Sequence, residues 1–218
     1  MGISSLLFLV AELLRPSIVS LAEDPLNFAA AVSSPAFVLS QLLFLPILAL
    51  LSCAAISVYK LLSTSRDNRP AFWAMVSCVI GIGLFLPSFG VNAFILPVAG
   101  QLYIHGDAGV FEVYLAALRQ PWAAILPQGG YLLVLGLTIF NIVVWRSGNL
   151  PKWAATLYWI GWTVCILSGN QLPKIGLAFV GVLVAVGGGG LARGVWRQAP
   201  IQLQPASQSI PAPAPMQA

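Results

Sequence analysis

Long apolar stretches that alternate with short basic turns constrain this chain more than any other feature. The clearest example runs from Pro121 to Trp153 and holds a long apolar segment, a basic turn and the start of a second apolar segment. Over the whole sequence 59% of the residues are hydrophobic and 7% are charged, whereas soluble domains are about a quarter charged. Because so few charges cannot cover a water-exposed surface, the sequence predicts an all-α, multi-pass membrane protein.

Segments of about 20 apolar residues are long enough to cross the ~30 Å hydrocarbon core as helices. We predict one transmembrane domain over residues 1–198, a bundle of six helices, or of five if the first segment does not cross. The predicted spans are residues 3–21, 36–62, 71–96, 121–145, 151–169 and 173–196. The strongly apolar part of the first segment, residues 4–14, is too short to cross, so this span depends on including the residues up to 21.

Two shorter helices are predicted outside these spans. Asp24 followed by Pro25 is typical of a helix start, which predicts a short interfacial helix over residues 25–32. Residues 110–120 have helical periodicity, which predicts an amphipathic helix on the membrane surface. The apolar face of that helix consists of Phe111, Tyr114, Leu115 and Leu118.

The distribution of lysine and arginine predicts the orientation. Seven of these residues lie at the C-terminal ends of the second, fourth and sixth spans or in the turns that follow, namely Lys60, Arg66, Arg69, Arg146, Lys152, Arg193 and Arg197. The other three, Arg15, Arg119 and Lys174, lie at the opposite ends of the spans. Because basic residues stay on the cytoplasmic side, we predict a plasma-membrane protein with both termini in the cytoplasm. Residues 199–218 contain five prolines and no charge, which predicts a disordered cytoplasmic tail.

The block from Trp145 to Trp153 (WRSGNLPKW), the six-span layout and the glycine-rich last span resemble a broad group of uncharacterised bacterial multi-pass membrane proteins. In layout the likeness covers roughly residues 36–197. The resemblance implies a six-helix membrane protein, and it brings no assigned chemistry, cofactor or catalytic residue. The short first segment departs from this layout.

Three amide side chains, Gln41, Asn92 and Gln128, are predicted at similar depth in the outer half of the bundle. Gln128 belongs to a Pro-Gln-Gly-Gly sequence that predicts a break in the fourth span, where freed backbone groups need protein or water as partners. Broken helices are typical of substrate sites in transporters. The three amides therefore form a candidate outward-facing polar cavity, with hydrogen bonds between helices as the alternative interpretation.

Glu12 is a candidate intramembrane acid, because carboxylates inside spans are costly and commonly functional, for example in proton coupling. The alternative is an ion pair with Arg15, which lies three residues further along on the same helix face. The other predicted spans contain no acidic residue, and a proton relay normally needs more than one titratable group. The sequence therefore favours the ion pair.

Small residues recur at four-residue spacing in the last two predicted spans. They are Gly161, Cys165 and Gly169 in the fifth span, and Gly190 and Gly194, together with the glycine run from Gly187 to Gly190, in the sixth. Small side chains let helix backbones approach closely, so we predict that these two spans pack through both stripes. The glycines lack the pattern of a nucleotide-binding loop, so no cofactor is predicted.

Residues suited to catalysis are few. The three cysteines are scattered through apolar segments and the single histidine, His105, has no second histidine, so neither a disulfide nor a metal site is predicted. His105, Asp107 and Glu112 are close in sequence at the outer surface. A small acid–base or metal site there is the alternative to a solvated loop, and no catalytic residue is assigned.

These patterns predict a non-catalytic integral membrane protein, structural or accessory to a membrane complex. Its expected partners are the lipid bilayer and another membrane protein or a second copy of the chain, and the net charge of +4 is assigned to topology rather than to nucleic acid. A small-solute or ion transporter that uses the polar cavity is the first alternative. A membrane enzyme that acts at the outer surface through His105 is the second.

Overall fold

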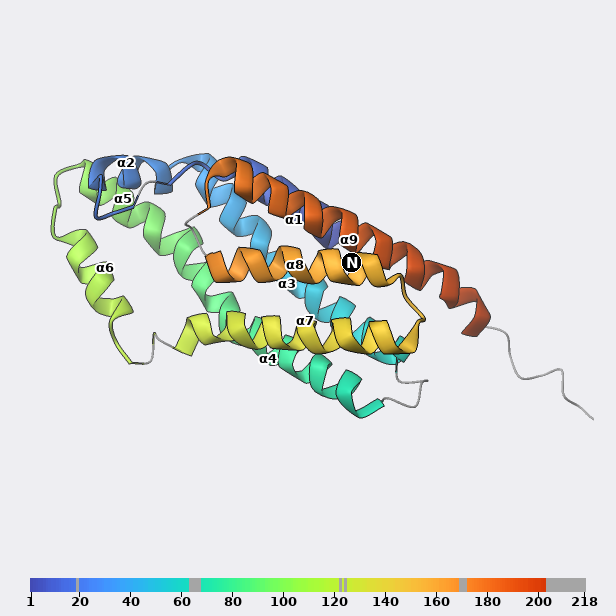
Figure 1. The fold of residues 1–218 in the computed structure, drawn as a ribbon. Coiled ribbons are helices and arrows are strands. Elements are labelled where there is room, and N and C mark those ends of the chain that lie inside the picture. Colours follow the sequence, from blue (N-terminus) through green and yellow to red (C-terminus); the bar gives the residue numbers. More distant parts are fainter. Residues whose placement is uncertain (19, 63–67, 122, 124, 169–171, 203–218) are drawn as a thin grey trace, which may run out of the picture.

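The computed structural model describes residues 1–18, 20–62, 68–121, 123, 125–168 and 172–202, and these residues are all-α. Their helices are α1 (Gly2–Leu14), α2 (Pro25–Val32), α3 (Pro35–Leu62), α4 (Asn68–Gly90), η1 (Val91–Ile95), α5 (Leu96–Ile104), α6 (Val110–Leu118), α7 (Ile125–Ser147), α8 (Lys152–Ser168) and α9 (Lys174–Gln202). Figure 1 shows an elongated bundle in which α2, α5 and α6 gather at one end. The end of α9 and the turn between α7 and α8 lie at the opposite end.

Four helices of the described residues are long and apolar enough to cross a membrane, so the predicted number of six spans is wrong. They are Pro35–Leu62, Arg69–Ile104, Ile125–Ser147 and Lys174–Gln198. The predicted first span ends early as α1, because Arg15 adopts an extended backbone before Pro16. The predicted fifth span is α8, whose 17 residues reach about 26 Å, less than the ~30 Å hydrocarbon core.

The two shorter helices and the tail follow the sequence in part. The prediction for α2 is confirmed: Asp24 caps it, its carboxylate accepting the backbone N–H of Asn27 at 3.0 Å. Helix α6 ends at Leu118 and buries Phe111, whereas Leu115 and Leu118 of the expected apolar face are exposed. Helix α9 continues to Gln202, so the first residues of the predicted tail are helical, and the rest of the tail lies outside the described residues.

Helices α4, η1 and α5 form one helical stretch that is longer than the span predicted over residues 71–96. Pro87 lies inside α4, and a π-helical segment begins four residues later, at Val91–Ile95. Proline lacks a backbone donor and its ring crowds the preceding turn, and a π-helical turn accommodates such a mismatch in the hydrogen-bond register. On the N-terminal side of this segment α4 packs on α7, and on its C-terminal side α5 packs on α2.

Two apolar cores hold the helices together. In the main core the Phe8 ring of α1 lies 5.7 Å from the ring of Phe44 in α3 and 4.8 Å from that of Trp162 in α8. The second core lies at the end where α2, α5 and α6 gather, and consists of Ala29, Val32, Phe37, Leu96, Ala99 and Phe111. The short α1 therefore packs on α3 and α9 with one face buried, and its first residue, Gly2, lies beside Ala192 of α9.

Helices α4 and α7 form the most extensive helix pair, and glycines set their separation. A methyl group at Gly81 would lie 2.6 Å from the Leu133 backbone nitrogen, and one at Gly129 would lie 2.5 Å from that of Phe85. At these two positions only hydrogen leaves room for the opposing backbone. The pairing of these positions also shows that the two helices run antiparallel.

The predicted helix break at Pro127-Gln128-Gly129-Gly130 is wrong. Helix α7 begins at Ile125 and runs through this sequence without interruption. Pro127 is the third helical residue, where a missing N–H costs little because the first four N–H groups of a helix have no partner within it. The two glycines serve packing instead: Gly129 faces α4, and a methyl group at Gly130 would lie 2.9 Å from Ile166 of α8.

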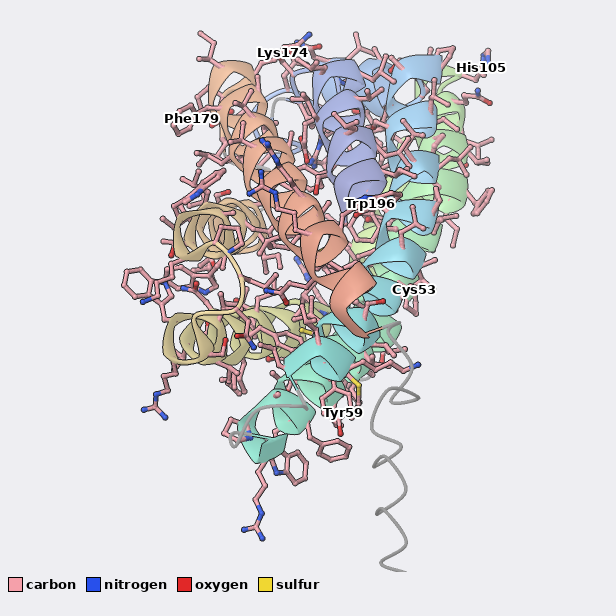
Figure 2. The ribbon with its side chains drawn as sticks, turned by 90° about the vertical axis from the view of Figure 1, so that its right-hand side faces the viewer. Cys53, Tyr59, His105, Lys174, Phe179 and Trp196 are labelled. Carbon is pink, nitrogen blue, oxygen red and sulfur yellow. The ribbon has the colours of Figure 1, made fainter. Side chains whose placement is uncertain are left out.

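The sides of the long helices carry large apolar side chains that other parts of the described chain do not cover. On α9, Ile175 is 85% exposed and Phe179 is 62% exposed, and Figure 2 shows Phe179 pointing away from the bundle. An aqueous surface does not favour such a continuous apolar face, whereas lipid chains do. The fold is therefore that of a helical membrane protein.

Candidate functional site

Glu12 is the one buried carboxylate among the described residues, and it lies near the end of α1 that faces the start of α9. The residue is 1% exposed. Its Oε2 lies 3.7 Å from Nη1 of Arg15, and its Oε1 accepts a weak hydrogen bond from the Cys165 thiol at 4.0 Å. Glu12 thus holds a counter-charge from its own helix and a polar hydrogen from α8.

The packing of α1 on α9 makes room for this carboxylate. A methyl group at Gly181 of α9 would lie 2.9 Å from the Leu9 side chain and 3.8 Å from Cβ of Glu12. The contact between α1 and α9 extends along the helix, because Gly188 faces Ser5 in the same way. Because Gly181 and Gly188 of α9 have no side chains, α1 approaches α9 closely enough to bury Glu12.

A groove of about 320 Å³ opens beside the ion pair. Its walls include Arg15, Pro16, Ser17 and Lys174, and no carboxylate of the described residues lines it. Glu12 compensates the charge of Arg15, so Lys174 supplies the remaining positive charge of the groove. The arrangement can attract a small anion.

The structure places Gln41 and Asn92 on neighbouring helices. The Phe44 and Phe89 rings stack at 4.6 Å, and Gln41 and Asn92 each lie three residues from this pair, toward the same end of the bundle. Gln41 is 1% exposed, and its Oε1 has no hydrogen-bond partner among the described residues. Asn92 is half-buried within the π-helical segment η1, a type of segment that is frequent at functional sites.

Gln128, the third residue of the predicted polar cavity, is exposed on the second turn of α7. Its neighbour Gly129 faces α4 at the level of Phe85. The burial of the two glutamines therefore differs: Gln41 lies in the interior and Gln128 at the surface of the bundle. The apolar cavity beside Leu137 and Tyr158, the groove beside Arg15 and the groove beside Arg193 are lined by neither of these glutamines nor by Asn92.

The small residues predicted to join the last two spans have different neighbours. Gly161 faces α9, where a methyl group would lie 2.6 Å from Val184, and Gly190 faces Ala154 of α8 at 2.7 Å. Cys165 turns toward Glu12 of α1, as described above. Gly194 lies against Pro151, and Gly169 is outside the described residues.

The closest approach of α8 and α9 is at Gly187, the first residue of the glycine run that was predicted to pack these two spans. A methyl group at Gly187 would lie 2.5 Å from the backbone nitrogen of Tyr158. The run of four glycines from Gly187 to Gly190 contained the signal, but the four-residue spacing alone did not show which of the four meets α8.

Polar side chains join α7 to α8, and the sequence analysis did not identify them. The Trp159 indole N–H donates to Thr138 Oγ1 at 2.8 Å, and the Trp145 indole N–H donates to Thr156 Oγ1 at 3.0 Å. Thr156 Oγ1 also lies 3.4 Å from Asn141 Oδ1. The spacing of Thr138, Asn141 and Trp145 on one helical face was a signal for this interface.

The loop between α5 and α6 contains the three residues considered for an acid–base or metal site. His105 is the C-cap of α5, and His105, Asp107 and Glu112 are all exposed. Within the described ranges no three histidine, cysteine or carboxylate side chains are grouped closely enough to hold a metal ion. The loop turns at Gly106, whose φ of 102° favours glycine.

Comparison of the chain with protein-family models, with curated proteins and with solved structures finds no match. The class of protein is therefore defined by the fold: an integral, helical membrane protein with four long apolar helices in its described part.

Proposed function

We propose that the chain is a non-catalytic membrane protein with a structural or accessory role in a membrane complex. The observation that supports this role is the neutralised interior. Among the described residues the buried polar side chains are three serines, Gln41 and Glu12, and Glu12 is paired with Arg15. A path for protons or solutes needs a continuous series of polar groups across the membrane, whereas these side chains belong to α1 and α3 alone and the helices pack closely at glycines.

The experiment combines two measurements on the full chain. The protein is extracted from its native membrane in a mild non-ionic detergent, and the mass and composition of the particle are determined. The same protein is then reconstituted into vesicles for flux measurements. A stoichiometric complex with another membrane protein or a second copy, without flux above that of empty vesicles, supports the role. A monomer that carries solute or ions across the vesicle membrane contradicts it.

A polar cavity for a transported solute is the second candidate, and it is supported by the Gln41–Asn92 region. The unpartnered Gln41 carbonyl oxygen lies next to a π-helical segment, and both features favour a site that takes a polar ligand. Cysteine substitution distinguishes a water-filled cavity from a dry interface. Asn92→Cys should react with a charged thiol reagent in a cavity, whereas Phe94→Cys, 61% exposed on the side of the same helix, should not.

The orientation with the basic end in the cytoplasm belongs to this proposal. The described cations at that end are Lys60, Arg69, Arg146, Lys152, Arg193 and Arg197. The exposed carboxylates of the described chain, Glu23, Asp24, Asp107 and Glu112, belong to the opposite end. This separation agrees with the rule that basic residues are retained in the cytoplasm.

Helix directions indicate how the chain returns across the membrane between α7 and α9. Trp145 pairs with Thr156 and Trp159 with Thr138, so α8 runs antiparallel to α7. The contacts of Gly161 and Gly190 show that α8 also runs antiparallel to α9. Because α7 and α9 run in the same direction, α8 carries the chain back between them, and we propose that it crosses despite its length of about 26 Å.

A further inference from the structure

A basic groove lies where the turn between α7 and α8 meets the last turns of α9. It encloses about 370 Å³, and its walls include Arg193, Arg197, Trp153, Asn149 and Gln198. It lies at the basic end of the bundle, which Figure 2 views directly, with Trp196 at the near end of α9. No carboxylate of the described residues lines it.

The local sequence builds this groove. Arg193 and Arg197 are four residues apart, so they project from the same face of α9. Gly190 and Gly194 bring the α9 backbone close to the start of α8: a methyl group would lie 2.8 Å from the Trp153 ring at Gly190 and 2.7 Å from Pro151 at Gly194.

The turn that forms the opposite wall is held in place by its own backbone and by α9. Gly148, with a φ of 68°, ends α7 in a left-handed conformation that glycine adopts readily. The Gln198 side-chain amide donates to the backbone carbonyl of Asn149. Both arginines are exposed, and neither forms an ion pair with any described carboxylate. Two guanidinium groups thus border one concave site without a counter-charge.

We propose that this groove binds the phosphodiester headgroup of an anionic phospholipid, such as phosphatidylglycerol. Guanidinium groups match phosphate oxygens with two parallel hydrogen bonds, and basic pockets between helices at one membrane face bind such headgroups. The position of the groove at the level of the lipid headgroups favours a lipid over a free solute. Trp153, 56% exposed, lines the groove, and Trp196, 81% exposed, lies in the same last turns of α9. Exposed tryptophan favours the headgroup layer.

The experiment measures lipid binding to the full-length protein in non-ionic detergent at physiological salt. Phosphatidylglycerol, phosphatidylcholine and inorganic phosphate are titrated separately. The groove variant is Arg193→Gln/Arg197→Gln. The matched control, Arg69→Gln/Arg146→Gln, removes two exposed cations from the same end outside the groove. Both variants lose the same net charge, so they lose the same long-range attraction. Thermal unfolding is checked first, and the single arginine variants replace a pair that does not fold.

The groove binds phosphatidylglycerol in preference to phosphatidylcholine, and the groove variant weakens this binding roughly 10-fold because two direct contacts are lost. The control pair weakens it less than about threefold, because screened surface charges contribute little. Equal losses in the two variants would overturn the proposal by showing that only bulk charge matters. Inorganic phosphate binding as tightly as phosphatidylglycerol would overturn the assignment to a lipid.

Discussion

At the scale of single residues, Glu12 and Arg15 show how a charged pair is accommodated inside a nearly uncharged bundle. The Glu12 side chain is fully buried, and that of Arg15 is 11% exposed. Burying a carboxylate alone is very costly, so the pair is stable only as a unit. The ion pair is therefore required for α1 to pack on α3 and α9.

Replacing Arg15 with leucine tests this requirement. Arg15→Leu should lower the free energy of unfolding by roughly 3 kcal/mol, because it leaves Glu12 buried without a counter-charge. The double variant Glu12→Gln/Arg15→Leu should recover much of that loss. Unfolding is followed by denaturant titration in mixed micelles. If the double variant is no more stable than Arg15→Leu, the arginine acts through packing and the interpretation is wrong.

Tyr114 gives a pH dependence outside the long apolar helices. Its ring packs against the second core beside Phe111, and this burial raises the pKa of the Tyr114 phenol above its ordinary value of 10.0. The folded state therefore keeps the phenol proton to higher pH than the unfolded state does. Its contribution to stability is complete below pH 10.0 and is lost as the pH rises above that value.

Tyr114→Phe isolates this effect, because phenylalanine keeps the ring and removes the titrating group. The wild-type protein should lose more thermal stability than Tyr114→Phe when the pH is raised from below to above the ordinary phenol pKa. The measurement is the difference in melting temperature between the two conditions for each protein. Parallel losses would show that Tyr114 does not contribute.

At the scale of helices, the interface between α4 and α7 depends on glycine, and α4 contains its own control. A methyl group at Gly81 meets the backbone of Leu133 at 2.6 Å, whereas one at Gly83 has no neighbour within 4 Å. Gly81→Ala should therefore destabilise the bundle by about 2 kcal/mol, because the added methyl group forces α4 and α7 apart. Gly83→Ala should be neutral or stabilising, because alanine favours the helix by up to about 1 kcal/mol. Equal stabilities in denaturant titration would contradict the close packing.

Composition and periodicity predicted the membrane class, helix α2 and much of the long helices, because those features depend on local sequence. They did not predict the span count. The apolar residues after Leu14 extended the first predicted span, but the backbone turns out of the helix at Arg15. The Pro-Gln-Gly-Gly sequence was interpreted as a break, yet Gly129 meets α4. Whether a glycine breaks a helix or packs against another depends on a partner that is distant in the sequence.

The Glu12 site was partly predictable for the same reason. Arg15 lies three residues away on the same helix, so spacing alone indicated the pair. Cys165 approaches from α8, 153 positions along the chain, and no local pattern identifies that contact. The basic groove likewise required the structure, because Asn149 and Gln198 meet only when α8 and α9 are packed.

At the scale of the whole molecule, charge divides the bundle into two ends. The cations named above gather at one end, and the exposed carboxylates belong to the other. This charge distribution, together with the apolar sides of the long helices, is what the proposed insertion with the basic end in the cytoplasm predicts.

Labelling in intact cells tests the central claim, that this bundle crosses the membrane with its basic end in the cytoplasm. The native cysteines Cys53, Cys78 and Cys165 lie within α3, α4 and α8, so the wild-type protein should not react with a membrane-impermeant thiol reagent. Ala108→Cys, in the exposed outer loop, should react in intact cells, and Arg69→Cys should react only after the membrane is opened. Reaction of Arg69→Cys in intact cells, with Ala108→Cys protected, would reverse the orientation. Reaction of neither variant until the cells are opened would show that the chain does not cross the membrane.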